Sequence, residues 1–211
     1  MTALNLWLAP RSAVFLTDAA HLDDNGRMIG VASKVARLPG LSAVASTRST
    51  RQLLDLIACS FGGAFKTFDH MVDELDSAVA VLAEMCGSKV TDFGYEVVLA
   101  GWSPKHEEMQ AWAGSGGAGS PFASQQVGGY RAPASPEVIS SFATTLDQIE
   151  IQDGRRLVEA QRQARISPYG GNSFHIVGGY IEETVVTPEG ITSRVLARWP
   201  DPVGQPISPR A

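Results

Sequence analysis

Blocks of strand-like sequence alternate with blocks of helical sequence along this chain, and that order constrains the fold more than any other feature. Residues 1–47 predict strands, and two helices follow them. After more strands, residues 135–165 predict a second pair of helices, and further strands complete the chain. This order fits two sheets packed face to face with helices on both outer sides. We therefore predict an α+β fold, a four-layer αββα sandwich of two antiparallel sheets, as a single domain over residues 1–211.

The N-terminal strands are predicted from alternation and from turn residues. Leucines at positions 4, 6 and 8 alternate with other residues, and the Ala-Pro-Arg-Ser segment at 9–12 is a turn signal. The short apolar run at 13–17 suits a strand covered on both faces. Asn25-Gly26 marks the next tight turn. Two more strands are predicted, at about Met28 to Val35 and Leu41 to Ala45.

The first pair of helices is predicted from apolar spacing and capping residues. Ser49 or Thr50 caps a helix in which apolar residues recur at helical spacing from Leu53 to Phe61. Thr67 caps the next one, whose single apolar stripe runs from Phe68 to Met85. Stripes of this kind indicate core packing rather than a cofactor site.

The second half of the chain is less regular in pattern. Strands are predicted at Tyr95 to Trp102 and Glu108 to Trp112, and residues 113–136, rich in Gly, Ser, Ala and Pro, predict a loop. The later elements are helices opening at Ser135-Pro136-Glu137 and spanning about 153–165, then strands over 174–177, 180–187 and 191–199. The tail after residue 200 is expected to be loose.

Charge and composition exclude several classes of protein. The net charge is -5 and the pI about 5.3, whereas nucleic-acid-binding domains normally carry a basic patch. No segment approaches the ~20 apolar residues of a membrane span. The two cysteines do not make a disulfide framework, which favours a reducing compartment. We therefore expect a cytoplasmic protein with no nucleic-acid or membrane partner.

No metal site and no cofactor is predicted. The four histidines show no ligand spacing. Residues 114–119 match the letters of a dinucleotide-binding fingerprint, but they open no clear apolar helix and lack a βαβ context.

The two N-terminal turns bring three chemically active residues together. If the turn at 9–12 closes an antiparallel hairpin, paired residue numbers sum to about 20 or 21, which places Thr2 beside Asp18. If Asn25-Gly26 closes the next turn, the sums are about 51 or 52, which places Lys34 beside Asp18. We therefore expect three neighbouring strands to hold a threonine, an aspartate and a lysine in one row on one face.

This trio has a chemical logic. Met1 precedes a small residue, Thr2, and is a substrate for methionine removal. An N-terminal threonine carries a hydroxyl nucleophile and an amine with a pKa of about 8, which can act as general base. A lysine ammonium nearby favours the neutral amine, and an aspartate keeps that lysine charged and oriented. The simpler interpretation is a strand-end threonine beside a structural Asp–Lys pair.

Thr2, Asp18 and Lys34 are spaced sixteen and sixteen residues apart, which resembles the spacing of nucleophile, aspartate and lysine in proteasome β subunits and their bacterial relatives. Those proteins belong to the N-terminal nucleophile (Ntn) hydrolase family. The resemblance covers about residues 1–187. It includes the apolar strand at 12–18, the lysine segment at 33–38, the Gly-ended strand at 97–102, the Gly-Ser segments at 114–117 and 119–122, and residues 165–171.

The resemblance implies the αββα Ntn fold and amide-bond hydrolysis through an acyl-enzyme on Thr2. Its own amine would be the base, with Lys34 and Asp18 as electrostatic support. A backbone N–H near Ser46 or Thr47 would serve the oxyanion. The resemblance further implies peptide or protein substrates, a homo-oligomeric ring, and an ATPase or particle partner.

Other positions depart from the family pattern. The family usually has an arginine two residues after the aspartate, and Ala20 stands there. The supporting serine near the Gly-rich segment is Ser115 in one register and is lost to Ala118 in another. Two alternatives therefore stay open. One is a catalytically silent Ntn-fold protein that serves as a structural or assembly subunit of a larger particle. The other is an amidase that uses Thr2 on a small molecule.

Overall fold

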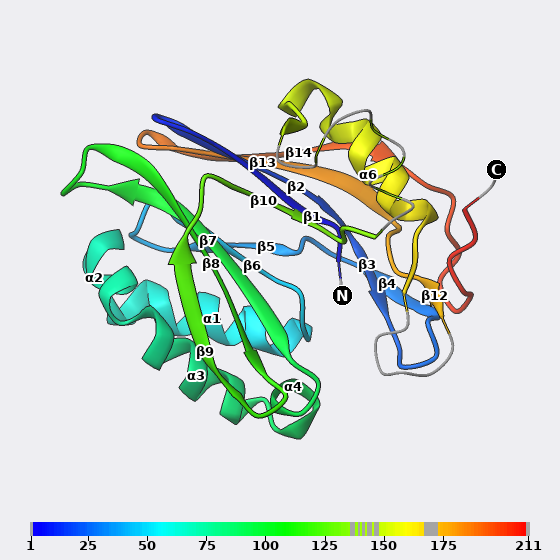
Figure 1. The fold of residues 1–211 in the computed structure, drawn as a ribbon, viewed down its shortest axis with the longest axis horizontal. Coiled ribbons are helices and arrows are strands. Elements are labelled where there is room, and N and C mark those ends of the chain that lie inside the picture. The colour runs from blue at the N-terminus through cyan, green and yellow to red at the C-terminus, as the bar shows by residue number, and fades with distance from the viewer. Residues whose placement is uncertain are drawn as a thin grey trace.

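The protein folds into two facing five-stranded sheets with helices on both outer sides (Figure 1). The structure is a computed structural model and describes residues 2–135, 148–166 and 173–209, together with 138, 140, 142 and 145. The predicted α+β sandwich of antiparallel sheets is confirmed. Within the described ranges, no helix is long and apolar enough to cross a membrane.

The first sheet contains the N-terminal hairpin at its centre. Its strand order is β10 (Gly129–Ala132), β1 (Leu4–Ala9), β2 (Ser12–Asp18), β13 (Tyr180–Thr187) and β14 (Gly190–Arg198). On its outer face lie η2 (Ile151–Asp153) and α6 (Gly154–Gln163), and α6 contacts β2. Each neighbouring pair is antiparallel, as the turn residues predict.

The second sheet carries the longer helices on its outer face. Its order is β5 (Val35–Leu38), β6 (Ala43–Thr47), β7 (Tyr95–Ser103), β8 (Glu108–Gly117) and β9 (Ser120–Gln126). The helices are α1 (Arg51–Ala64), α2 (Phe68–Asp73), α3 (Leu75–Met85) and α4 (Ser88–Thr91). The hydroxyl of Thr50 accepts a hydrogen bond from the N–H of Leu53, and this confirms Thr50 as the cap of α1.

Apolar side chains from both sheets form the central core. Leu4, Leu6 and Phe15 of the first sheet pack in one cluster with Val44 and Val98 of the second. Burial of each such side chain contributes roughly 1.5–3 kcal/mol. This core holds β2 and β6 at a fixed separation, and the candidate site lies where these two strands end.

Residues 113–136 do not form the loop that their composition predicts. They complete β8 and supply β9 and β10. Gly114 and Gly116 lie where a Cβ would meet the ring of Phe122 and the hydroxyl of Tyr95. Residues 117–119 turn the hairpin, all with positive φ. The small residues therefore reflect close packing and a tight turn, not an irregular segment.

Three further expectations differ from the structure. The apolar stripe from Phe68 to Met85 is divided at Glu74, because α2 packs on β7 whereas α3 packs on β9 and α1. The strand predicted over 28–35 is divided into β4 (Met28–Val31), which pairs with β3 (Ala20–Leu22), and β5 in the second sheet. In the described part of the tail, residues 201–209, Ile207 is buried in a cluster with Ala20 and Met28, so this part packs on the fold.

The remaining elements are short. β11 (Arg165–Ile166) pairs with β12 (Phe174–His175). The predicted helix start at Ser135-Pro136-Glu137 falls mostly outside the described residues, and so does the segment 167–171.

Replacing Gly101 with valine is expected to lower the free energy of unfolding by roughly 3 kcal/mol. A Cβ there would lie 2.4 Å from the ring of Phe68 and 2.6 Å from the Cβ of Ala43. Urea denaturation measures the loss. Gly63→Ala is the matched control, because nothing lies within 4 Å of that Cβ and the helix α1 gains about 0.5 kcal/mol. Equal stability of both variants would refute this account of Gly101.

Candidate active site

The two hairpins place the predicted trio as follows. In β1–β2, Leu4 pairs with Thr17, a residue sum of 21 that puts Thr2 close to Asp18. In β3–β4, Ala20 pairs with Val31, a sum of 51. The expectation of three neighbouring strands in one row is wrong, because β5 belongs to the second sheet and β2 has β1 and β13 as neighbours. Lys34 instead approaches Asp18 from the segment that connects β4 to β5.

Thr2, Asp18 and Lys34 nevertheless meet through hydrogen bonds. The Thr2 hydroxyl donates to Asp18 Oδ1 at 2.6 Å, and the N–H of Ala3 donates to the same oxygen at 2.9 Å. Lys34 Nζ lies 3.0 Å from both carboxylate oxygens. The exposed fractions are 1% for Thr2, 0% for Asp18 and 6% for Lys34, so the trio is almost fully buried.

The second oxygen of Asp18 is also hydrogen-bonded by the backbone. The N–H of Ala20 donates to Oδ2 at 3.2 Å, and that of Gly178 donates at 3.0 Å. The carboxylate therefore accepts from two side chains and three backbone groups. These hydrogen bonds fix the orientation of the carboxylate in a buried setting.

Lys34 is held at both ends. Burial lowers the pKa of its ammonium; Asp18 acts in the opposite direction, and the Arg48 charge lowers that pKa further. Its backbone carbonyl accepts a hydrogen bond from the Ser46 hydroxyl at 2.7 Å. Ser46 therefore positions the lysine segment through its side chain.

The backbone of β6 offers a candidate oxyanion donor at Thr47. The N–H of Arg48 donates to the Glu96 carbonyl at 2.9 Å and is engaged with β7. Because successive N–H groups of a strand point to opposite edges, that of Thr47 points toward β5, the side on which Lys34 lies. Of the two predicted positions, Thr47 is therefore the better placed.

Arg48 is a site residue that the sequence reasoning missed. Its Nε donates to the Thr2 carbonyl at 3.3 Å, and its Nη1 lies 2.6 Å from Glu96 Oε2. The hydroxyl of Tyr130 donates to the same Glu96 oxygen. The only signal in the sequence was the position of Arg48 directly after Thr47. This network connects the start of β1 to both sheets.

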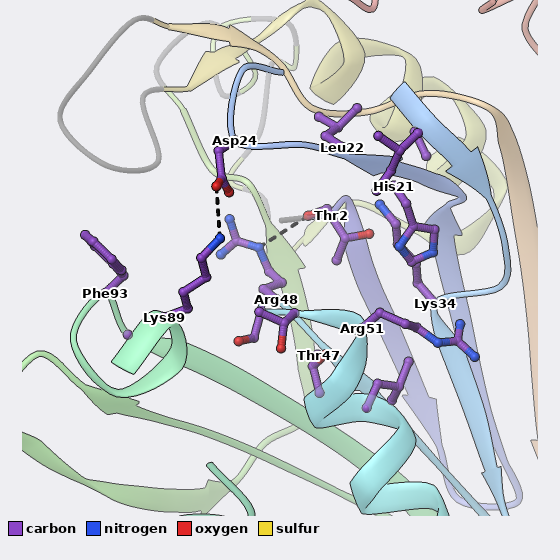
Figure 2. A pocket seen from close by; sticks show the side chains of 16 residues that line it. Thr2, His21, Leu22, Asp24, Lys34, Thr47, Arg48, Arg51, Lys89 and Phe93 are labelled. Atoms are coloured by element: carbon purple, nitrogen blue, oxygen red, sulfur yellow. Dashed lines mark hydrogen bonds and ion pairs between the residues drawn. The ribbon is translucent and has the colours of Figure 1, made fainter. Parts of the chain in front are cut away.

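A cavity of about 290 Å³ opens beside the trio (Figure 2). Thr2, Lys34 and Thr47 line it, together with residues from the β3–β4 hairpin, the start of α1, and α4. Ser115 does not line this cavity, because the structure places it at an exposed position of β8. It is therefore the predicted site residue that lies apart from the others.

No group of three or more His, Cys, Asp or Glu side chains that could hold a metal ion is present among the described residues. Cys59 and Cys86 are free thiols. The residues that line the cavity supply the Thr2 hydroxyl, ammonium and guanidinium groups, the imidazole of His21 and the carboxylate of Asp24.

His21 lines the same cavity and is expected to make the protein acid-sensitive. Burial lowers its pKa, and the charges of Lys34 and Arg51 lower it further. Below pH 6.5 the His21 ring binds a proton in the unfolded chain but not in the folded protein. The free energy of unfolding therefore decreases as pH decreases, until the pH reaches the lower pKa of the folded state. One such site contributes at most about 1.4 kcal/mol per pH unit, and less for a half-buried ring.

Urea unfolding of wild type and His21→Asn at pH 7.5, 6.0 and 5.0 measures this effect. As pH falls, the free energy of unfolding of wild type is expected to decrease more than that of His21→Asn. The pKa of His175 is also lowered, first by burial, so His175→Asn gives a second, independent decrease in slope. A parallel pH dependence of wild type and His21→Asn would contradict the prediction.

Comparisons with known proteins support the fold. No family model matches the chain, and no curated protein sequence matches it. Among solved structures, the chain is similar to an Anbu (Gly-1) mutant from Hyphomicrobium sp. strain MC1, with a TM-score of 0.61 and 10% sequence identity. The match covers 93% of this chain and 88% of that one. At this sequence identity the likeness shows a shared fold.

Proposed function

We propose that this protein is an N-terminal threonine hydrolase that cleaves peptide or other amide bonds through an acyl-enzyme on Thr2. The observation that carries the proposal is the Thr2–Asp18–Lys34 hydrogen-bonded cluster at the wall of a cavity. A buried lysine with a lowered pKa beside a hydroxyl is typical of functional sites. The proteasome-like fold supports the same assignment.

The mechanism begins with removal of Met1, which converts the Thr2 nitrogen into a free amine. The hydroxyl rotates from Asp18 toward this amine, which takes its proton as Oγ1 attacks the amide carbonyl. The N–H of Thr47 and the Lys34 charge stabilise the oxyanion. The amine then protonates the leaving nitrogen, and water hydrolyses the threonine ester to free the acid and restore the hydroxyl.

Asp18 positions and charges Lys34 rather than acting as the base. Its carboxylate already accepts five other hydrogen bonds besides the one from Thr2, so both of its oxygens are engaged by fixed donors. The free amine of Thr2 is the proposed base instead, because an ordinary α-amino pKa of about 8 suits proton transfer near neutral pH.

Intact mass and active-site labelling test the proposal. Protein from its native source is expected to lack Met1, and a peptide epoxyketone is expected to add one equivalent to Thr2. This reagent bonds both the hydroxyl and the free amine of an N-terminal threonine, so buried Thr17 serves as an internal control that stays unlabelled. Retention of Met1, or labelling elsewhere, would refute the mechanism. Parallel assays with peptides and with small amides separate a peptidase from an amidase.

A catalytically silent structural subunit is the second candidate function. The observation that favours it is the Thr2 side chain itself, which is 1% exposed and already hydrogen-bonded to Asp18. In that case the cluster would anchor the start of β1, with no chemistry. An epoxyketone that leaves the Met1-free protein unlabelled, together with normal assembly of Thr2→Ala, would support this candidate over the hydrolase.

We further propose that copies of the chain assemble into a homo-oligomer. Val81 and Met85 lie four residues apart on α3 with 57% and 63% exposure, an apolar pair suited to a contact between copies. Analytical ultracentrifugation tests this, with Met85→Lys expected to shift the protein toward the monomer. A monomeric wild type would contradict it. An ATPase or particle partner and a cytoplasmic location stay predictions.

A further inference from the structure

The cavity beside Thr2 is lined by an excess of positive charge, although the chain as a whole carries a net charge of -5. Its cationic residues are Lys34, Arg48, Arg51 and Lys89. Asp24 is the single acidic residue among the described residues that line it. The side chains that face the cavity are therefore mostly cationic, and this favours an anionic ligand.

The carboxylates that bind three of these cations lie outside the lining. Lys34 is bound by Asp18, as described above. Arg48 is bound by Glu96, and Arg51 by Asp55. Because these partners do not line the cavity, Asp24 is the one carboxylate among the described lining residues that faces the cations.

Lys89 is bound differently, by an acid at the mouth of the cavity. Its Nζ lies 2.9 Å from Asp24 Oδ2, and the two side chains are 71% and 69% exposed (Figure 2). Asp24 belongs to the β3–β4 turn and Lys89 to α4, so the pair joins two separate elements across the opening. An exposed pair of this kind is weak and exchanges its partner readily.

We propose that this cavity binds a substrate carboxylate, and that the site favours an acidic residue, Glu or Asp, on the acyl side of the amide bond next to Thr2. Lys89 exchanges Asp24 for the substrate carboxylate, and Arg48 adds a second positive charge beside it. The role of the bound residue in cleavage rests on the proposed hydrolase, whereas its binding does not.

The rim of the cavity is suited to the rest of such a substrate. Ile29 and Phe93 line it and are 62% and 57% exposed. They come from β4 and from the segment after α4. Apolar side chains at the rim can pack against neighbouring residues of a peptide, while the cationic interior fixes its acidic residue.

Equilibrium binding tests this proposal independently of turnover. Three fluorescein-labelled peptides, identical except for Glu, Gln or Lys at one position, are titrated into the wild-type protein and followed by anisotropy. The Glu peptide is expected to bind about tenfold more tightly than the Gln peptide, and the Lys peptide most weakly. Raising the salt concentration should reduce the Glu preference.

Two rim variants sharpen the assignment. Lys89→Gln is expected to bring the Glu and Gln peptides within about twofold of each other. Asp24→Asn is expected to tighten the Glu peptide about threefold, since it removes the competing carboxylate, and to leave the Gln peptide unchanged. Lys105→Gln, a lysine that does not line the cavity, is the control and should change neither.

The outcomes separate this proposal from the proposed function. Equal binding of the Glu and Gln peptides to the wild-type protein overturns the carboxylate site, whether or not either peptide is cleaved. A Glu preference that survives Lys89→Gln overturns the assignment to this cavity. A Glu preference that depends on Lys89 in a protein without turnover supports the site and refutes the hydrolase alone.

Discussion

Replacing Thr2 with alanine is expected to lower the rate of amide hydrolysis roughly 10⁴-fold or more, to the background of the assay. The substitution removes the nucleophilic oxygen that donates to Asp18 at 2.6 Å. Alanine is also a small residue, so removal of Met1 continues and the amine stays in place. The measurement is kcat for a peptide amide, together with the intact mass of each preparation.

Thr2→Ser is the matched control, because it keeps both the hydroxyl and the amine. We expect it to retain hydrolysis within about tenfold of wild type and to keep its epoxyketone labelling. If Thr2→Ala keeps wild-type activity, a different group performs the chemistry. If Thr2→Ser loses as much activity as Thr2→Ala, positioning by the threonine methyl group, and not the hydroxyl alone, is essential.

Replacing Asp18 with alanine is expected to have the largest effect on stability, a loss of about 3–5 kcal/mol in the free energy of unfolding. The carboxylate is 0% exposed and accepts hydrogen bonds from Thr2, Lys34 and three backbone groups. Its removal leaves the Lys34 ammonium buried without its carboxylate and several donors unsatisfied. Chemical denaturation followed by circular dichroism measures the loss.

A second substitution distinguishes the buried charge from general disruption. In the Asp18→Ala background, Lys34→Met is expected to recover part of the loss, since the uncompensated ammonium is then gone. Asp24→Asn removes an exposed pair and should cost less than about 1 kcal/mol. A loss below 1 kcal/mol for Asp18→Ala would show that the cluster contributes little to folding.

Local patterns in the sequence were sufficient to predict the hairpin registers near the site. Turn residues at 9–12 and 25–26 set residue sums of 21 and 51, and these sums depend only on where each turn lies. The proximity of Thr2 to Asp18 follows from the first sum, whereas the contact of Lys34 with Asp18 does not follow from the second. The sums also do not predict that β5 belongs to the second sheet. Strands of both sheets show the same alternation of apolar and polar residues, and only the packing of the core decides which sheet a strand joins.

Other features depended on contacts between residues distant in sequence. The composition of β8 and β9, rich in Gly and Ser, led to the prediction of a loop. Glycine is needed at positions 114 and 116 because Phe122 and Tyr95 occupy the space that a Cβ would take. Arg48 joins the site through Thr2, which precedes β1, and through Glu96 of β7. Propensity describes single segments and carries no information on such partners.

The Gly178 N–H that donates to Asp18 comes from a residue 160 positions further along the chain. The site is therefore complete only after nearly the whole polypeptide has been synthesised, because β13 must pair with β2 before that bond forms. Until Gly178 has been made, Asp18 Oδ2 lacks this donor. We infer that the nascent chain cannot assemble the complete carboxylate site until this late segment has been synthesised.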